Sequence, residues 1–169
     1  LTSSTFPARF MLVAAMNPSQ DAVGSGAAGY DCGTAQKRRY YAKLSKPLLD
    51  RIDLQLEVKK VKLEEITSTA LAEGSDAIRR RVAAARDLQA ERFRGLKRRL
   101  FANSQMRNAD IRKYCPLDGE GDDLLRLAVE RFDLSARGYF RVLKVARTIA
   151  DLQGSEMIVA PCVREALQY

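Results

Sequence analysis

The sequence predicts a mainly helical protein with a few strands near its N-terminal end. Two segments have strand character, because residues 10–16 (FMLVAAM) form a continuous apolar run and residues 52–58 alternate between apolar and polar side chains. From about Ser75 onward, apolar residues recur with the 3.6-residue period of amphipathic helices. This change of period divides the chain into a short strand-containing part and a longer helical part.

The first strand is expected at residues 10–16, since an uninterrupted apolar run of this length is typical of a strand buried on both faces of a parallel sheet. The run stops at Asn17 and Pro18. Ligands of open α/β sheets bind beyond the carboxyl ends of the strands, so Asn17 is well placed to contact a substrate or an attacking water. An asparagine before a proline is equally typical of a plain turn, and both interpretations stay open.

The second strand is expected at residues 52–58, and Arg51 stands directly before it, between Asp50 and Asp53. At the entrance of a strand its guanidinium can point away from the core. One interpretation is a weak surface ion pair with either aspartate, worth about 0–1 kcal/mol. The other is a cation that senses a nucleotide.

A long amphipathic helix is predicted from about Ser75 to Phe93. Its expected core-facing stripe consists of Ile78, Val82, Ala85 and Leu88. Three consecutive cations lie largely off this stripe, namely Arg79, Arg80 and Arg81. They form either a solvated face or a surface that contacts a polyanion. The basic segment 95–113 has little periodicity and is interpreted as a loop with a short helix.

Three further helices are predicted toward the C-terminus. A Gly/Asp turn leads into a helix from roughly Asp122 to Phe132, and Pro161 opens a last short helix. Between them, Ser135 caps a helix that Gly154 closes. The core-facing residues expected on that central helix are Tyr139, Val142, Leu143, Ala146, Ile149 and Ala150.

Arg137 lies in the first turn of this central helix. The helix macrodipole disfavours a cation there by about 0.3–1 kcal/mol. A bound phosphate resolves the conflict, because the free backbone N–H groups and Arg137 would hold it together. An exposed arginine that tolerates the small penalty is the alternative.

Composition narrows the possible functions. The 169 residues include 29 basic and 21 acidic side chains, a formal charge of +8 that favours polyanionic partners. Histidine is absent, which excludes a Ser-His-Asp triad and histidine metal sites. The three separated cysteines and the lack of a long apolar run predict a cytoplasmic protein without a membrane segment. No GxxxxGK[ST] phosphate loop is present.

Three blocks of the chain carry a family resemblance: residues 6–18 (FPARFMLVAAMNP), 40–58 (YYAKLSKPLLDRIDLQLEV) and 134–169 (LSARGYFRVLKVARTIADLQG to EALQY). With these blocks the chain resembles the C-terminal half of the magnesium-chelatase-like AAA+ ATPases of the YifB/ComM type. The resemblance implies that residues 1–62 are the C-terminal part of the AAA+ α/β core and that residues 63–169 are a helical lid domain.

The resemblance also implies roles for three residues. Asn17 corresponds to the sensor asparagine that orients the hydrolytic water. Arg51 corresponds to the arginine finger offered to the ATP of the neighbouring subunit, and Arg137 to the lid arginine that reads the γ-phosphate. Phosphoryl transfer requires positioned water and cations around the developing charge, so these roles agree with the physical interpretations above.

Two departures from the family pattern limit what this chain is expected to do alone. The phosphate loop and the acidic Mg²⁺-binding strand of the family would precede Leu1, so we expect no ATP hydrolysis by this chain. The family loop after Asn-Pro usually carries four cysteines, whereas this loop has Ser19 and Asp21 at the first pair and retains only Cys32. One thiolate cannot form a four-ligand structural site, and no zinc is expected.

The function implied by the resemblance is that of an ATP-driven DNA motor, a helicase or branch-migration enzyme that serves DNA uptake and recombination. It would act as a homo-oligomeric ring, expected to be a hexamer. ATP and Mg²⁺ would be bound in the full-length parent. One alternative is a motor that drives metal insertion into a tetrapyrrole. Another is a basic helical module that binds nucleic acid without catalysis.

Overall fold

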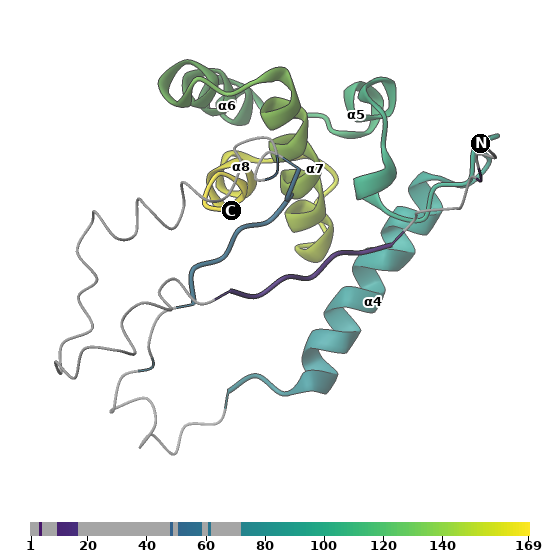
Figure 1. The fold of residues 1–169 in the computed structure, drawn as a ribbon. Coiled ribbons are helices and arrows are strands. Elements are labelled where there is room, and N and C mark those ends of the chain that lie inside the picture. Colours follow the sequence, from purple (N-terminus) through teal and green to yellow (C-terminus); the bar gives the residue numbers. More distant parts are fainter. Residues whose placement is uncertain (1–3, 5–9, 17–47, 49–50, 59–60, 62–71) are drawn as a thin grey trace, which may run out of the picture. The chain divides into compact units, whose positions relative to one another are not determined.

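The computed structural model describes residues 4, 10–16, 48, 51–58, 61 and 72–169. The chain divides into two units, Leu1–Leu49 and Asp50–Tyr169, and the helices treated below belong to the second (Figure 1). The observed helical elements are α4 (Ser75–Arg92), η2 (Asn103–Gln105), α5 (Asn108–Tyr114), α6 (Gly119–Phe132), α7 (Ala136–Leu152) and α8 (Ala160–Ala166). The mainly helical fold class is therefore confirmed.

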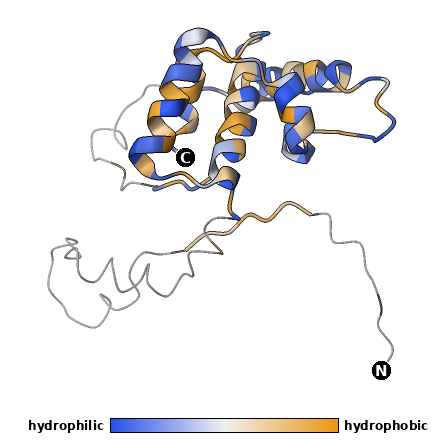
Figure 2. Cartoon of the chain, turned by 90° about the horizontal axis from the view of Figure 1, so that it is seen from above, coloured by the Kyte–Doolittle hydropathy of each residue, from blue (hydrophilic) through white to orange (hydrophobic). Residues whose placement is uncertain are grey.

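Helix α7 is the centre of the second unit. Helices α4, α5 and α8 and the η2 turn all pack against it, and α6 packs against α8. Its expected core-facing residues are buried except Tyr139, which is partly buried. The helices combine hydrophobic and hydrophilic residues, as Figure 2 shows.

The ends of α6 and α7 are set by local chemistry. Ser135 Oγ accepts a hydrogen bond from the Gly138 N–H at 3.2 Å, as predicted for an N-cap. The predicted start of α6 near Asp122 is wrong by three residues. Asp118 is the N-cap instead, because its Oδ1 accepts a bond from the Gly121 N–H at 2.7 Å.

Helix α4 has the predicted extent, but its stripe is mostly exposed. Ile78, Val82 and Leu88 are 42%, 45% and 43% exposed, and of the predicted stripe only Ala85 is buried. The buried side chains on the C-terminal half of α4 are Ala85 and Gln89, and Phe93 follows them. The predicted stripe is therefore wrong for this helix: at its C-terminal half the buried face runs through Ala85, Gln89 and Phe93 and leaves Leu88 exposed, and in its N-terminal half Ile78 and Val82 are exposed as well.

The two predicted strands are not observed as strands. Residues 10–16 and 52–58 have no strand assignment, and apolar side chains such as Phe10 and Val58 are 78% and 93% exposed. A strand requires a ladder of repeated hydrogen bonds to a neighbour, and the described residues show no such ladder for either segment. Within the described part of the chain the β-pairing is a single parallel bridge between Leu117 and Ile158, which links the start of α6 to the start of α8.

None of the helices in the described ranges is long and apolar enough to cross a membrane. The proposed boundary between residues 62 and 63 falls in a part of the chain that the structure does not describe, and it stays a prediction.

The C-terminal end of α7 generates a stability prediction. Gly154 has φ +69°, a conformation that an L side chain adopts only with strain, although no atom would contact an added Cβ. Gly154→Ala should therefore lower the free energy of unfolding by about 1 kcal/mol, measured by urea denaturation. Gly119→Ala is the matched control, because Gly119 is in the first turn of α6 with equally open surroundings. The control should be neutral or slightly stabilising, and equal losses at both sites would contradict the argument.

Candidate functional site

The N-terminus of α7 presents Arg137 to solvent. Arg137 is the second residue of the helix, is exposed, and shares the first turn with no acidic residue. The described residues form no ion pair with it. The first N–H groups of a helix lack partners within its own backbone, and Ser135 satisfies only that of Gly138. This end of α7 therefore combines free donors, the positive end of the dipole and a guanidinium, the features that bind phosphate.

Arg51 lies in a turn of the same unit and is exposed. The residue after it is tied to α7, because Arg141 Nη1 donates a hydrogen bond to the Ile52 carbonyl at 3.1 Å. A second bond, from the Gln55 N–H to the Tyr169 carbonyl at 3.0 Å, holds the same segment to the C-terminus. Arg141 lies one helical turn after Arg137, so the segment carrying Arg51 is attached to the helix that carries Arg137. Asn17 lies outside the described residues.

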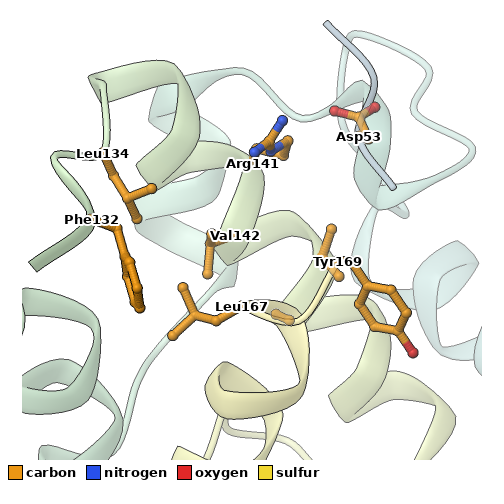
Figure 3. A pocket seen from close by; sticks show the side chains of 9 residues that line it. Asp53, Phe132, Leu134, Arg141, Val142, Leu167 and Tyr169 are labelled. Atoms are coloured by element: carbon orange, nitrogen blue, oxygen red, sulfur yellow. The ribbon is translucent and has the colours of Figure 1, made fainter. Parts of the chain in front are cut away.

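A small hollow lies where this segment meets α7 and α8 (Figure 3). Its volume is about 120 Å³, and its lining is mostly apolar, with Leu134, Val142 and Leu167 among the side chains. Ligand pockets usually enclose about 300–1,000 Å³ and contain several convergent polar groups. The hollow is therefore too small for a nucleotide, and the phosphate-binding features lie on the exposed helix end instead.

Two of the three candidate arginines on α4 are neutralised by neighbours. Arg79 Nη1 contacts Asp76 at 2.7 Å, and Arg81 forms two hydrogen bonds to Glu73 at 2.8 and 3.1 Å. Arg80 is exposed and has no acidic partner among the described residues. The structure therefore keeps all three at the surface but leaves one unpaired cation where the sequence suggested three.

The largest polar cluster of the second unit is buried beneath α4, at the other end of α7. Its centre is Asp151, which is 2% exposed and accepts hydrogen bonds from four side chains. Arg92 of α4 binds both carboxylate oxygens, one of them at 2.9 Å. Asn103 donates at 2.7 Å and Gln89 at 3.3 Å. We call this group, together with Arg147, the Asp151 cluster.

Arg147 completes the cluster from within α7. Its Nε donates to Asp151 at 3.0 Å, and its two terminal nitrogens donate to the carbonyls of Ser155 and Glu156, the latter at 2.6 Å. Every buried side-chain donor and acceptor of the described residues has a partner. A fully satisfied polar cluster in a low-dielectric core is rigid, and it fixes the relative positions of the segments that contribute to it.

The cluster shifts the pKa values of its charged groups. Burial alone would raise the pKa of Asp151, but hydrogen bonds from Arg92 and Asn103 and the charge of Arg147 outweigh it and hold that pKa below its usual value. Burial lowers the pKa of Arg147, and Asp151 partly offsets this. Both groups are charged at neutral pH, so the cluster holds one carboxylate between two guanidinium groups.

Sequence reasoning missed this cluster. Arg147 and Asp151 are four residues apart on α7, and both interrupt the apolar face formed by Ala146, Ile149 and Ala150. Two opposite charges four residues apart on the core-facing side of a helix could have predicted a buried ion pair. Arg92 and Asn103 gave no such signal, because they lie 59 and 48 residues from Asp151.

The cysteines have no catalytic environment in the described residues. Cys115 and Cys162 are both buried and free, and burial raises the pKa of Cys115 to about 11, so its thiol stays protonated at neutral pH. No three His, Cys, Asp or Glu side chains gather as in a metal site within the part of the chain that is described. Ser19, Asp21 and Cys32 lie outside it, so the expected absence of zinc stays a prediction.

Comparison with known protein families identifies the chain. The family model described as magnesium chelatase, subunit ChlI matches residues 1–66, and the model described as magnesium chelatase, subunit ChlI C-terminal matches residues 72–169. The second match alone covers more than half of the chain. The protein therefore belongs to the magnesium chelatase subunit ChlI family, as the motifs indicated.

Individual relatives agree with this assignment. The chain is 39% identical over 171 residues to the competence protein ComM of Haemophilus influenzae, covering 97% of this chain and 31% of that protein. It is 39% identical over 166 residues to YifB of Escherichia coli, covering 98% of this chain and 31% of the relative. Similarity to Rv2897c of Mycobacterium tuberculosis is 38% over 156 residues, or 88% of this chain and 29% of the relative. The chain thus spans about 30% of the length of these relatives.

The Asp151 cluster predicts a large loss of stability from one isosteric change. Asp151→Asn leaves Arg92 and Arg147 buried without a counter-charge, which should cost about 3–5 kcal/mol of unfolding free energy in urea denaturation. Glu91→Gln is the control, since it removes a carboxylate from an exposed pair with Arg94. The control should leave the midpoint nearly unchanged. A loss no larger for Asp151→Asn than for Glu91→Gln would show that the cluster contributes little.

The lowered pKa of Asp151 also predicts a pH dependence. The folded state binds its proton less readily than the unfolded state, so the stabilisation is complete above the unfolded pKa of about 3.9 and is lost as pH falls toward the folded pKa. The stability difference between the wild type and Asp151→Asn should be constant above about pH 5 and shrink below it. Urea denaturation of both proteins from neutral to acid pH measures this difference. A difference that grows in acid would contradict the sign of the shift.

Proposed function

We propose that this chain is the nucleotide-sensing and lid portion of a magnesium-chelatase-like AAA+ ATPase that drives movement along DNA. The observation that carries the proposal is Arg137, an exposed cation without an acidic partner among the described residues, at the N-terminus of the central helix α7. Family membership supports the proposal of an ATPase. The model described as magnesium chelatase, subunit ChlI matches residues 1–66, and the model of its C-terminal part matches residues 72–169.

In this proposal each phosphoryl transfer uses residues of two adjacent subunits, namely Asn17 and Arg137 of the subunit that holds the ATP and Arg51 of its neighbour. Arg137 and the first N–H groups of α7 bind the γ-phosphate of ATP held by the same subunit. Arg51 stabilises the charge that develops on the ATP of a neighbouring subunit, and Asn17 orients the attacking water. The ring that this arrangement requires is homo-oligomeric, and we propose a hexamer in the cytoplasm.

The rigidity of α7 matters for this role. A phosphate contact at Arg137 can move the lid as a body only if the helix is firmly connected to the rest of the unit. The Asp151 cluster provides this connection at the opposite end of α7, through hydrogen bonds to α4 and to the segment around Asn103. Binding at one end of the helix is then transmitted to α4 at the other end.

Among the described residues no three His, Cys, Asp or Glu side chains gather as they would around a metal ion. We name no Mg²⁺ ligand and derive no step through the ion. The phosphate loop that would bind the remainder of ATP·Mg is also missing from the sequence. Both would belong to the longer protein, of which the relatives' lengths are an indication.

Two observations favour DNA as the substrate of the motor: the positive charge of the chain and the description of one relative. The chain carries a formal +8, and ComM of Haemophilus influenzae is described as a competence protein. The second candidate, metal insertion into a tetrapyrrole, is favoured by the family description as magnesium chelatase. An ATPase assay of the full-length parent with and without DNA separates them, because a DNA motor should hydrolyse ATP faster when DNA is present.

Replacing Arg51 tests the ATPase assignment in the full-length parent. Arg51→Ala should leave ATP binding nearly intact but slow hydrolysis by roughly 10³-fold or more, because the missing charge acts on the transition state in a neighbouring active site. Mixing this variant with subunits that lack the phosphate-loop lysine should restore part of the activity.

The control for this test is Arg137→Ala, which removes a contact made within the subunit. It should weaken nucleotide binding as well as hydrolysis, and mixing with phosphate-loop variants should not rescue it. If Arg51→Ala instead abolished nucleotide binding or unfolded the protein, Arg51 would be only the partner of a nearby aspartate.

A further inference from the structure

The segment between α4 and α5 concentrates positive charge. Residues 94–107, which we call the basic strap, contain five basic residues and no acidic residue. Helix α4 has the same number of basic residues but also three acidic ones. The strap therefore accounts for more of the chain's excess charge than the arginine run of α4, although it is of similar length. It joins the C-terminal end of α4 to α5 (Figure 1).

The strap is a folded element with two distinct sides. Along its first half, exposure alternates: Leu96, Arg98 and Leu100 are partly or fully buried, whereas the residues between them are exposed. Leu100 is 7% exposed and belongs to the core. The strap thus has an inner row that attaches it to the domain and an outer row that faces solvent.

The inner row is fixed by specific hydrogen bonds. Arg98 Nη2 binds Asp110 of α5 at 2.5 Å, and its Nη1 donates to the Gln105 carbonyl at 3.2 Å. The Phe101 N–H donates to Gln105 Oε1 at 2.8 Å. Asp110 also accepts a bond from the Arg107 N–H at 2.8 Å. These bonds involve the side chains of Arg98, Gln105 and Asp110, so they fix the backbone that carries the outer row and leave its cations without an acidic partner.

The outer row combines cations with an aromatic ring. Lys97, Arg99 and Arg107 are exposed, and no acidic side chain of the described residues pairs with them. Phe101 is 58% exposed although it directly follows a core residue. Cations that track a phosphate backbone, beside an aromatic face on which a base stacks, are the features with which proteins bind single-stranded nucleic acid.

Duplex DNA fits this surface less well. Cations alone suffice to bind the phosphates of a duplex, but its bases are stacked on one another and offer no free face to Phe101. The arginine run of α4 provides no such ring, and Asp76 and Glu73 already occupy two of its three cations.

We infer that the outer row of the basic strap is a binding surface for single-stranded DNA, with Lys97, Arg99 and Arg107 on the phosphates and Phe101 stacked on a base. This inference rests on the proposed function as a DNA motor, and it assigns the DNA contact to a particular segment of the lid. It also assigns the contact to the strap in place of Arg79, Arg80 and Arg81.

The test measures binding of the full 169-residue chain to a fluorescein-labelled oligothymidine by anisotropy over a series of salt concentrations. The double variant Lys97→Gln/Arg99→Gln should reduce the slope of log K against log salt by about 1.4, since each phosphate contact on a single strand contributes about 0.7. The matched control Arg79→Gln/Arg81→Gln removes the same formal charge from paired arginines. It should change the slope little.

Phe101 separates stacking from charge. Phe101→Ala should weaken binding to the single strand by about 5- to 150-fold, as expected for the loss of one stacked base, while binding to a duplex changes less than twofold. Phe101→Tyr keeps a ring and should retain wild-type affinity, which also excludes a loss of folding as the cause. Circular dichroism of each variant verifies the helices.

Two results would overturn the inference: an unchanged slope for the strap double variant, or equal losses on single strand and duplex for Phe101→Ala. The latter would show that Phe101 does not act by stacking on an unpaired base. Neither result touches the ATPase proposal, because this assay contains no nucleotide. Conversely, failure of the Arg51 experiment leaves strap binding measurable, so the two proposals fail separately.

Discussion

The buried carboxylate of Asp151 is the constraint on which the second unit depends. A carboxylate can be removed from water only if its lone pairs are satisfied, and here the donors come from α4, from the η2 turn and from α7 itself. This single group thereby connects α4 and the η2 turn to α7. The second guanidinium, Arg147, extends the constraint to the turn after α7 through two backbone carbonyls.

Local signals in the sequence predicted the local structure well. Ser135 and Gly154 bracket α7 because capping and left-handed φ are properties of a few neighbouring residues. The strands at 10–16 and 52–58 could not be judged in this way, since a strand is completed by a neighbour that the local sequence does not specify. The exposure of Ile78 and Val82 has a similar cause: period reveals which side of α4 is apolar but not which side packs against α7.

In the candidate site, too, features set by neighbouring residues were predictable, whereas features set by distant partners were not. The position of Arg137 in the first turn of a helix followed from spacing alone, and the structure places it there. The arginine run of α4 was singled out by its density of charge, yet the acids one turn or more away neutralise most of it. The two sides of the basic strap could not be predicted from local sequence, because Arg98 is directed inward by Asp110, a contact across 12 residues.

The long sequence separation within the Asp151 cluster has a consequence for the order of folding. Helix α7 forms from contacts three and four residues apart, whereas Arg92 and Asp151 are separated by 59 positions. Bringing such distant segments together costs chain entropy before a hydrogen bond between them can offset that cost. The individual helices should therefore form before α4 docks onto α7. Desolvation of Asp151 must then coincide with the arrival of Arg92. We therefore expect α4 docking to be the slow and most cooperative step, and a truncation that removes α4 would leave the remaining helices with a solvent-exposed carboxylate and a loosened core.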